Sequence, residues 1–137
     1  MEVNRHHHVV LDTSAYSGFR KGHPAALDLV ASAAVITVPV VVIGELEAGF
    51  ELGRRTAENR LVLTEFLGEP GVEILDATRK TARLYARIFA ELRAAGTPIP
   101  INDVWIAAAS MESGGHLLTF DRDFDRIPDL EHTLLEP

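Results

Sequence analysis

The sequence predicts an α/β fold, a three-layer α/β/α sandwich around a mainly parallel sheet of four to five strands. Short apolar segments rich in β-branched residues alternate along the chain with longer segments of helical composition. Alternation of this kind produces a parallel sheet that helices cover on both faces. The chain has 137 residues, of which 47% are hydrophobic. This is enough for one core, so we predict a single domain over residues 1–137.

Four segments have the composition of buried strands and are bounded by turn residues. They are His8 to Leu11, Val35 to Val38, Val72 to Leu75 and His116 to Thr119. His132 to Leu135 is a candidate for a further strand at the edge of the sheet. Residues 1–5 form a short lead. We assign no shared site to the adjacent histidines at positions 6–8, because side chains alternate across a strand.

Between the strands, apolar residues recur at helical spacing, and proline and glycine mark the helix ends. The predicted helices cover Ala25 to Ala33, Pro39 to Phe50, Thr56 to Leu67, Ala77 to Ala95, and a last segment that starts at Asn102. Thr13 and Ser14 begin a turn or helix after the first strand. We expect Asn102 to be the N-cap of the last helix and Asp76 to cap the long helix before it.

Composition limits the possible functions. No apolar run approaches the roughly 20 residues of a membrane helix, and no signal-peptide pattern is present, so we expect a cytoplasmic protein without a membrane partner. The chain has no cysteine, which excludes disulfides, thiolate metal sites and cysteine nucleophiles. The net charge of −7 argues against a dedicated nucleic-acid binder. It does not exclude a nuclease, because bound cations reverse the local potential of an acidic site.

Four acids occupy positions that the predicted topology brings to one edge of the sheet. Asp12 ends the first strand and Asp121 follows the fourth, while Asp103 lies in the first turn of the last helix. Glu45 lies in the helix after the second strand, among apolar and small helical neighbours. Ligands of open α/β sheets bind beyond the carboxyl ends of the strands. Asp76 also ends a strand, and spacing alone does not exclude it.

Each acid has an ordinary explanation by itself, as a cap, a buried hydrogen-bonded group or a turn residue. All four together predict a metal site, because neighbouring carboxylates repel unless they are protonated or bridged by cations. Oxygen ligands of this kind select Mg²⁺ or Mn²⁺. Such a site suits the hydrolysis of a phosphodiester by an activated water. Thr13, Ser14 and Thr119 are candidates to orient that water or the groups around it.

Motifs in four places carry a family resemblance. They are Leu11-Asp12-Thr13-Ser14, Gly44-Glu45-Leu46, Asn102-Asp103 with Trp105-Ile106-Ala107-Ala108, and Leu117 to Phe124 followed by Ile127-Pro128. No single motif is diagnostic, but their order is specific. Over nearly its whole length the sequence resembles the PIN-domain ribonucleases of the VapC toxin type.

The resemblance implies a role for each matching residue. Asp12, Glu45, Asp103 and Asp121 would be the catalytic acids and metal ligands, and Asp123 an additional or supporting acid. Thr13, Ser14 and Thr119 would be supporting hydroxyls. The resemblance also implies endonucleolytic RNA cleavage that depends on Mg²⁺ or Mn²⁺, a homodimer, and inhibition by a cognate antitoxin protein. Asp129, where relatives often have glycine, and the histidines of the lead depart from the family pattern.

Other protein classes share part of this pattern. A phosphoacceptor receiver domain needs a lysine at its site, and neither Lys21 nor Lys80 directly follows a predicted strand. A haloacid-dehalogenase-like phosphatase needs an acid two residues after Asp12, where this chain has Ser14. A non-catalytic PIN-like module that binds RNA or protein remains the alternative function. The presence of all four acids argues against it.

Overall fold

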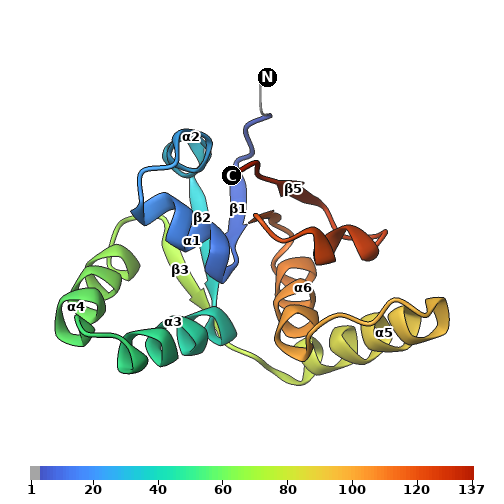
Figure 1. Ribbon diagram of the computed structural model, residues 1–137. Helices are drawn as coiled ribbons and strands as arrows, with labels where there is room; N and C mark the ends of the chain where they lie inside the picture. Colours follow the sequence, from blue (N-terminus) through green and yellow to red (C-terminus); the bar gives the residue numbers. More distant parts are fainter. Residues whose placement is uncertain (1–3) are drawn as a thin grey trace.

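The computed structural model describes residues 4–137 as a five-stranded sheet between two layers of helices (Figure 1). The first three residues of the predicted lead lie outside the described residues. The strands are β1 (His8–Leu11), β2 (Val35–Pro39), β3 (Val72–Leu75), β4 (His116–Thr119) and β5 (His132–Leu134). All neighbouring strands are parallel, in the order β3-β2-β1-β4-β5. The predicted fold class is confirmed.

The middle strand of the sheet, β1, is buried on both faces because helices cover the sheet on either side. Val9, Val10 and Leu11 of β1 are fully buried, as expected for a parallel strand with helices on either side. The neighbouring strand β4 buries Leu117 and Leu118 in the same way. With β1 in the middle, the chain segments that follow β1 and β4 begin side by side at the carboxyl ends of the strands.

The helices form two layers. They are α1 (Thr13–Arg20), α2 (Pro24–Ser32), α3 (Val40–Leu52), α4 (Thr56–Leu67), α5 (Arg79–Ala95) and α6 (Ile101–Ser113), with a short 3₁₀ helix η1 (Arg122–Arg126). In Figure 1, α1, α2 and α4 lie on one side of the sheet and α5 and α6 on the other, while α3 follows β2 at the carboxyl ends of the strands. Within residues 4–137, no helix combines the length and the apolar character that a membrane crossing requires.

The two predicted helix caps are wrong. The N-cap of α6 is Pro100, whose carbonyl accepts from the backbone N–H groups of Asp103 and Val104, so Asn102 lies inside the helix. Proline fixes its own φ and has no N–H to satisfy, and it therefore starts the helix earlier than the expected polar cap. The N-cap of α5 is Thr78 instead of Asp76. Thr78 forms a reciprocal capping box with Thr81, which satisfies two backbone N–H groups.

Candidate active site

The carboxyl ends of β1 and β4 carry two of the predicted acids. Asp12 directly follows β1 and is the N-cap of α1, and Asp121 follows β4 and is the N-cap of η1. Because Leu11 pairs with Leu118 in the register of the two strands, the backbones that lead to both aspartates leave the sheet at the same level. The fold therefore brings together residues that lie more than one hundred positions apart in the sequence.

Asp12 is held by three hydrogen bonds. Its Oδ1 accepts from the Ala15 N–H and the Ser14 hydroxyl, both at 2.7 Å, and its Oδ2 accepts from the Thr119 hydroxyl. Only 4% of Asp12 is exposed. Burial raises the pKa of this carboxyl above its ordinary value, and the three donors oppose that change by stabilising the anion. Asp12 is thus a fixed, desolvated carboxylate.

Thr119 connects Asp12 with Asp121. The Thr119 side chain is fully buried, and its hydroxyl donates to Asp12 and accepts from the Asp121 N–H at 2.9 Å. Ser14 makes a second connection, because its hydroxyl donates to Asp12 and accepts from the Phe120 N–H at 3.0 Å. These two of the three predicted supporting hydroxyls therefore hold the ends of β1 and β4 in fixed relative positions.

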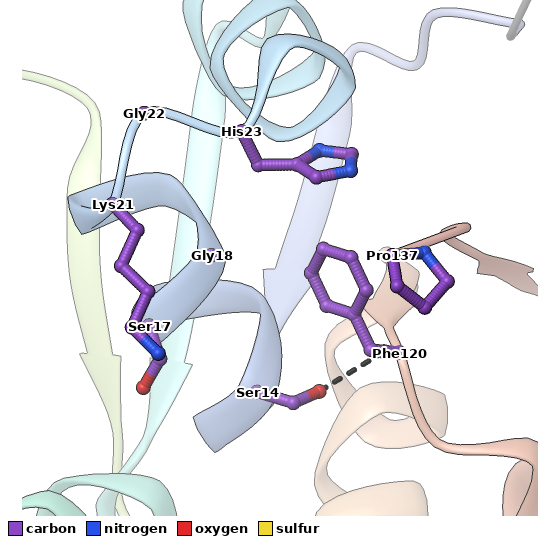
Figure 2. Close-up of a pocket in the computed structure, with 8 residues that line it drawn as sticks. All are labelled: Ser14, Ser17, Gly18, Lys21, Gly22, His23, Phe120 and Pro137. Atoms are coloured by element: carbon purple, nitrogen blue, oxygen red, sulfur yellow. Dashed lines mark hydrogen bonds between the residues drawn. The ribbon is translucent and has the colours of Figure 1, made fainter.

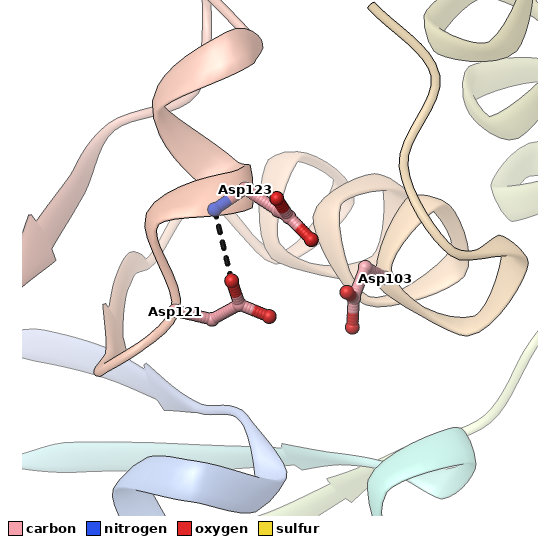
Figure 3. A group of neighbouring side chains, drawn as sticks. All are labelled: Asp103, Asp121 and Asp123. Atoms are coloured by element: carbon pink, nitrogen blue, oxygen red, sulfur yellow. Dashed lines mark hydrogen bonds between the residues drawn. The ribbon is translucent and has the colours of Figure 1, made fainter.

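Three aspartates converge beside Asp12. One carboxylate oxygen from each of Asp103, Asp121 and Asp123 lies within 4.8 Å of the other two, and all three side chains are partly buried. Figure 3 shows them pointing toward a common space between η1 and the first turn of α6. The Asp121 carboxylate also accepts from the Asp123 N–H at 2.9 Å, which fixes the start of η1. We call Asp103, Asp121 and Asp123 the aspartate triad.

Asp103 is the most perturbed member of the aspartate triad. Its pKa is raised from 3.8 to about 7, first by burial and then by the charges of Asp121, Glu45, Asp12 and Asp123. Four neighbouring carboxylates thus act electrostatically on Asp103. A proton or a cation among them would relieve this repulsion, which is the behaviour expected of a site built to bind positive charge.

Glu45 reaches the same region from α3. Its Oε1 accepts from the Thr13 hydroxyl at 2.6 Å, and its Oε2 accepts from the Asn102 amide at 3.4 Å. Asn102, expected to be a cap, instead contacts Glu45 from the first turn of α6. Thr13, the third predicted supporting hydroxyl, orients this carboxylate. The negative charge of Glu45 contributes to the raised pKa of Asp103.

Asp76, the acid that spacing alone did not exclude, lies elsewhere, and so does Asp125. Asp76 is exposed at the end of β3, and β2 separates β3 from β1. Asp125 contacts His132, with 2.6 Å between Oδ1 and Nε2. Sequence reasoning underestimated Asp123, which belongs to the aspartate triad. Its spacing of two residues from Asp121 was the available signal, since a short 3₁₀ turn can direct both side chains to one side.

The donor set suits a hard divalent cation. Carboxylate oxygens from α6 and from the start of η1 meet here, and Asp12 and Glu45 do not belong to this close group. Oxygen ligands of this kind hold Mg²⁺, Mn²⁺ or Ca²⁺ rather than the softer metals. The Asp121 carboxylate is already ordered by its hydrogen bond from the Asp123 N–H, and the Asp123 carboxylate lies 3.6 Å from the Arg126 guanidinium. A cation bound among them would therefore find a partly preorganised site.

The matched protein family agrees with this architecture. The family model described as "PIN domain" matches residues 9–130. Ribonuclease VapC4 of Mycobacterium tuberculosis is 35% identical over 96 residues, which cover 69% of this chain and 72% of that protein. Ribonuclease VapC2 of Rickettsia felis is 29% identical over 126 residues, which cover 88% of this chain and 92% of that protein.

Solved structures with the same fold include toxin–antitoxin complexes. VapBC2 from Rickettsia felis bound to a DNA fragment from their promoter has a TM-score of 0.80 at 26% identity, covering 92% of this chain and 97% of that one. DNA-bound VapBC from Salmonella typhimurium has a TM-score of 0.78 at 27% identity, covering 91% and 96%. The predicted resemblance is confirmed. The chain belongs to the PIN-domain family, in which its named relatives are VapC ribonucleases.

Proposed function

We propose that this protein is a divalent-metal-dependent endoribonuclease and the toxin of a toxin–antitoxin pair. The observation that carries the proposal is the aspartate triad, whose oxygens lie within 4.8 Å of one another beside the buried Asp12. The relatives support the substrate class, because they are named ribonucleases. The solved relatives support the toxin role, because one of them is described as a member of the VapBC family of toxin–antitoxin systems.

Mg²⁺ or Mn²⁺ is the cofactor that we propose. The aspartate triad would hold it, and Asp12 and Glu45 would complete the acidic surroundings. Among residues 4–137, the Oδ2 atom of Asp12 accepts one hydrogen bond, from Thr119, so this oxygen keeps a lone pair for a ligand. When bound, such a cation polarises the scissile phosphate and makes a water molecule a stronger nucleophile.

The protein's own contribution is orientation. Ser14, Thr119 and the Ala15 N–H fix Asp12, while Thr13 and Asn102 fix Glu45. Carboxylates held in this way do not need to reorganise when substrate arrives, and such preorganisation lowers the activation barrier. The burial of Asp12 also strengthens its electrostatic effect on any charge that develops nearby.

Cleavage of cellular RNA in Mg²⁺ tests the enzymatic part. We expect discrete fragments with the wild-type protein, no fragments in a chelator, and a loss of about 100-fold or more in rate for Asp103→Asn. Asp76→Asn is the matched control, because it removes an exposed carboxylate after a strand that does not border β1. Fragments that persist unchanged in Asp103→Asn would come from a contaminating nuclease, and the proposal would fail.

Antitoxin control is the second part of the proposal, together with a homodimer and a cytoplasmic location. We expect a short neighbouring reading frame to encode a protein that copurifies with this chain and suppresses its RNA cleavage. A copurifying product that leaves cleavage unchanged would contradict the toxin role while leaving the nuclease intact. A non-catalytic binding module, the alternative function, would bind RNA and cleave none of it in any divalent metal.

A further inference from the structure

A cavity of about 530 Å³ lies between α1 and the segment that follows β4 (Figure 2). Its volume is in the range of small-molecule sites, roughly 300 to 1,000 Å³. Its walls include Ser14, Ser17, Gly18, Lys21, His23 and Phe120. We call it the Phe120 pocket. None of the proposed roles of the acidic residues uses it.

The Phe120 pocket is continuous with the proposed catalytic residues. Ser14 lines it, and the same Ser14 hydroxyl donates to Asp12 and accepts from the Phe120 N–H. Phe120 itself lies between Thr119, which contacts Asp12, and Asp121 of the aspartate triad. A group in this pocket would therefore lie directly beside any phosphate that the acids act on.

Gly18 gives the aromatic wall its position. A Cβ atom at Gly18 would lie 2.5 Å from Cε1 of Phe120, which is far inside van der Waals contact. The absence of a side chain at this position lets the Phe120 ring lie directly on the backbone of α1. The ring is partly exposed, so one part of it contacts the helix and another part borders the cavity.

His23 fixes the Phe120 ring from the other side. The two rings are nearly perpendicular, with their centroids 4.9 Å apart. Nδ1 of His23 accepts from the Ala26 N–H, and Nε2 lies 2.7 Å from the Glu136 carbonyl, so the neutral ring with its proton on Nε2 satisfies both contacts. Phe120 is thus a fixed aromatic surface, as base stacking requires.

The opposite wall carries positive charge and a hydroxyl. Lys21 and Ser17 lie four residues apart on α1, and in Figure 2 their side chains lie together across the helix from Phe120. The chain contains only two lysines and has a net charge of −7. Lysine is therefore rare in this chain, and an ammonium with a neighbouring hydroxyl is suited to contact a phosphate.

From this arrangement we propose that the Phe120 pocket binds the nucleotide next to the scissile phosphate of single-stranded RNA. The base packs against Phe120, and the phosphate on its outer side contacts Lys21 and Ser17. Phe120 therefore influences which bases flank the cleaved bond, whereas Lys21 contributes affinity without base preference. This inference rests on the proposed ribonuclease function, and it assigns a residue of that site to sequence selection.

Two measurements on the same variants test the Phe120 pocket. The first is the affinity for fluorescein-labelled single-stranded RNA of randomised sequence, measured in Ca²⁺ by fluorescence anisotropy. The second is cleavage of the same RNA in Mg²⁺, with the fragment ends sequenced to give the base preference. For Phe120→Leu we expect about tenfold weaker binding and a flatter base preference at one flanking position. Phe120→Tyr retains a ring and should restore both.

Lys21→Gln should weaken binding without changing the base preference. It should also reduce the slope of log affinity against log salt by roughly 0.7, the value for one phosphate contact in single strands. The matched controls are Phe89→Leu and Lys80→Gln on the exposed side of α5, which should behave as wild type. Thermal unfolding of each variant separates weaker binding from loss of fold.

The outcomes separate this inference from the proposed function. If wild type cleaves RNA but Phe120→Leu binds and selects bases as wild type does, the pocket assignment is wrong and the nuclease stands. If wild type binds RNA without cleaving it and Phe120→Leu weakens that binding, the pocket stands and the nuclease does not. If the variants change only the binding of a copurified antitoxin, the pocket serves a protein partner and the inference is overturned.

Discussion

At the amino edge of the sheet three strands begin with histidine, whereas at the carboxyl edge aspartates lie just beyond the ends of the two neighbouring strands β1 and β4. His8, His116 and His132 are the first residues of β1, β4 and β5. Asp12 and Asp121 follow the ends of β1 and β4. A parallel sheet separates the two edges, because all strands start on one side and end on the other.

The titratable side chains at the two edges have different hydrogen-bond partners and different electrostatic surroundings. At the amino edge each imidazole has a partner: His8 contacts Thr37, His116 contacts Thr133, and His132 contacts Asp125. At the carboxyl edge the carboxylates of the aspartate triad face one another, and burial, followed by repulsion from the neighbouring acids, raises the pKa of Asp103 to about 7. The amino edge is satisfied internally. The carboxyl edge gains stability from an added proton or cation, which is how a binding site differs from a structural cluster.

The largest expected difference between variants of the two edges is the increase in the free energy of unfolding that Mg²⁺ produces. At a concentration of about 100 times the dissociation constant, Mg²⁺ should raise the free energy of unfolding of wild type by about 2.7 kcal/mol. Asp121→Asn should lose most of this gain, because it removes a carboxylate of the aspartate triad. His132→Asn at the amino edge should keep it. Thermal unfolding over a Mg²⁺ titration measures the gain, and an equal gain in Asp121→Asn would place the cation elsewhere.

The next effect concerns pH in the absence of metal. Since the pKa of Asp103 is raised from 3.8 to about 7, the folded protein binds this proton more tightly than the unfolded chain. The protonated carboxyl of Asp103 therefore makes its full contribution to the free energy of unfolding below about pH 4. This contribution is lost as the pH rises to about 7. Asp103→Asn should exceed wild type in unfolding free energy by about 2 kcal/mol at pH 7, after allowance for solvent screening.

Denaturant unfolding of both proteins between pH 4 and pH 8 measures this effect. The quantity to compare is the difference between Asp103→Asn and wild type, since other groups that titrate in this range cancel in it. A difference that does not grow with pH would mean that burial and the neighbouring acids do not raise the pKa of Asp103 in the folded protein.

Mutation of one threonine at each edge allows a direct comparison of the two edges. The buried hydroxyl of Thr119 donates to the Asp12 carboxylate and accepts from the Asp121 N–H. Thr119→Val should lower the free energy of unfolding by about 2 kcal/mol, because both partners lose a bond in a buried place. Thr133→Val removes one partly exposed contact with His116 and should lower it by less than about 1 kcal/mol. Equal losses in denaturant unfolding would contradict the contrast between the edges.

The smallest expected effect is the change of stability with pH that His116 causes. Burial, and secondly the charge of His6, lower the pKa of His116 from 6.5 to about 4. The neutral imidazole of His116 therefore makes its full contribution to the free energy of unfolding above about pH 6.5. This contribution is lost as the pH falls toward 4. Relative to His116→Gln, wild type should lose about 1 kcal/mol between pH 7 and pH 5 after allowance for screening. A constant difference between the two proteins over this range would show that His116 does not titrate as expected.

Local patterns were sufficient to predict most of the fold. The bounds of β1, β3 and β4 coincide with the predicted strands, because each is a short β-branched or apolar run between turn residues. The parallel topology then placed Asp12 and Asp121 at one edge before any contact was known. Glu45 was indicated by its apolar helical neighbours, and it does contact Thr13.

The details that the sequence did not predict depend on tertiary contacts or on proline. Asn102 is a good N-cap by type, but Pro100 starts α6 before it. Asp76 resembles Asp12 in its position after a strand, yet the order of strands in the sheet removes it from the site. The Phe120 pocket depends on Gly18 meeting a ring that is remote in sequence. No local pattern contains that contact.

The Thr119 to Asp12 hydrogen bond spans 107 positions of the chain, and this has a consequence for synthesis on the ribosome. A nascent chain that has not yet exposed β4 and η1 has Asp12 and Glu45 but no aspartate triad. Its acids are separated by unfolded polypeptide, and closing so long a loop is slow. If Asp121 and Asp123 hold the metal as proposed above, catalytic competence arises only after both residues have left the exit tunnel and β4 has paired with β1.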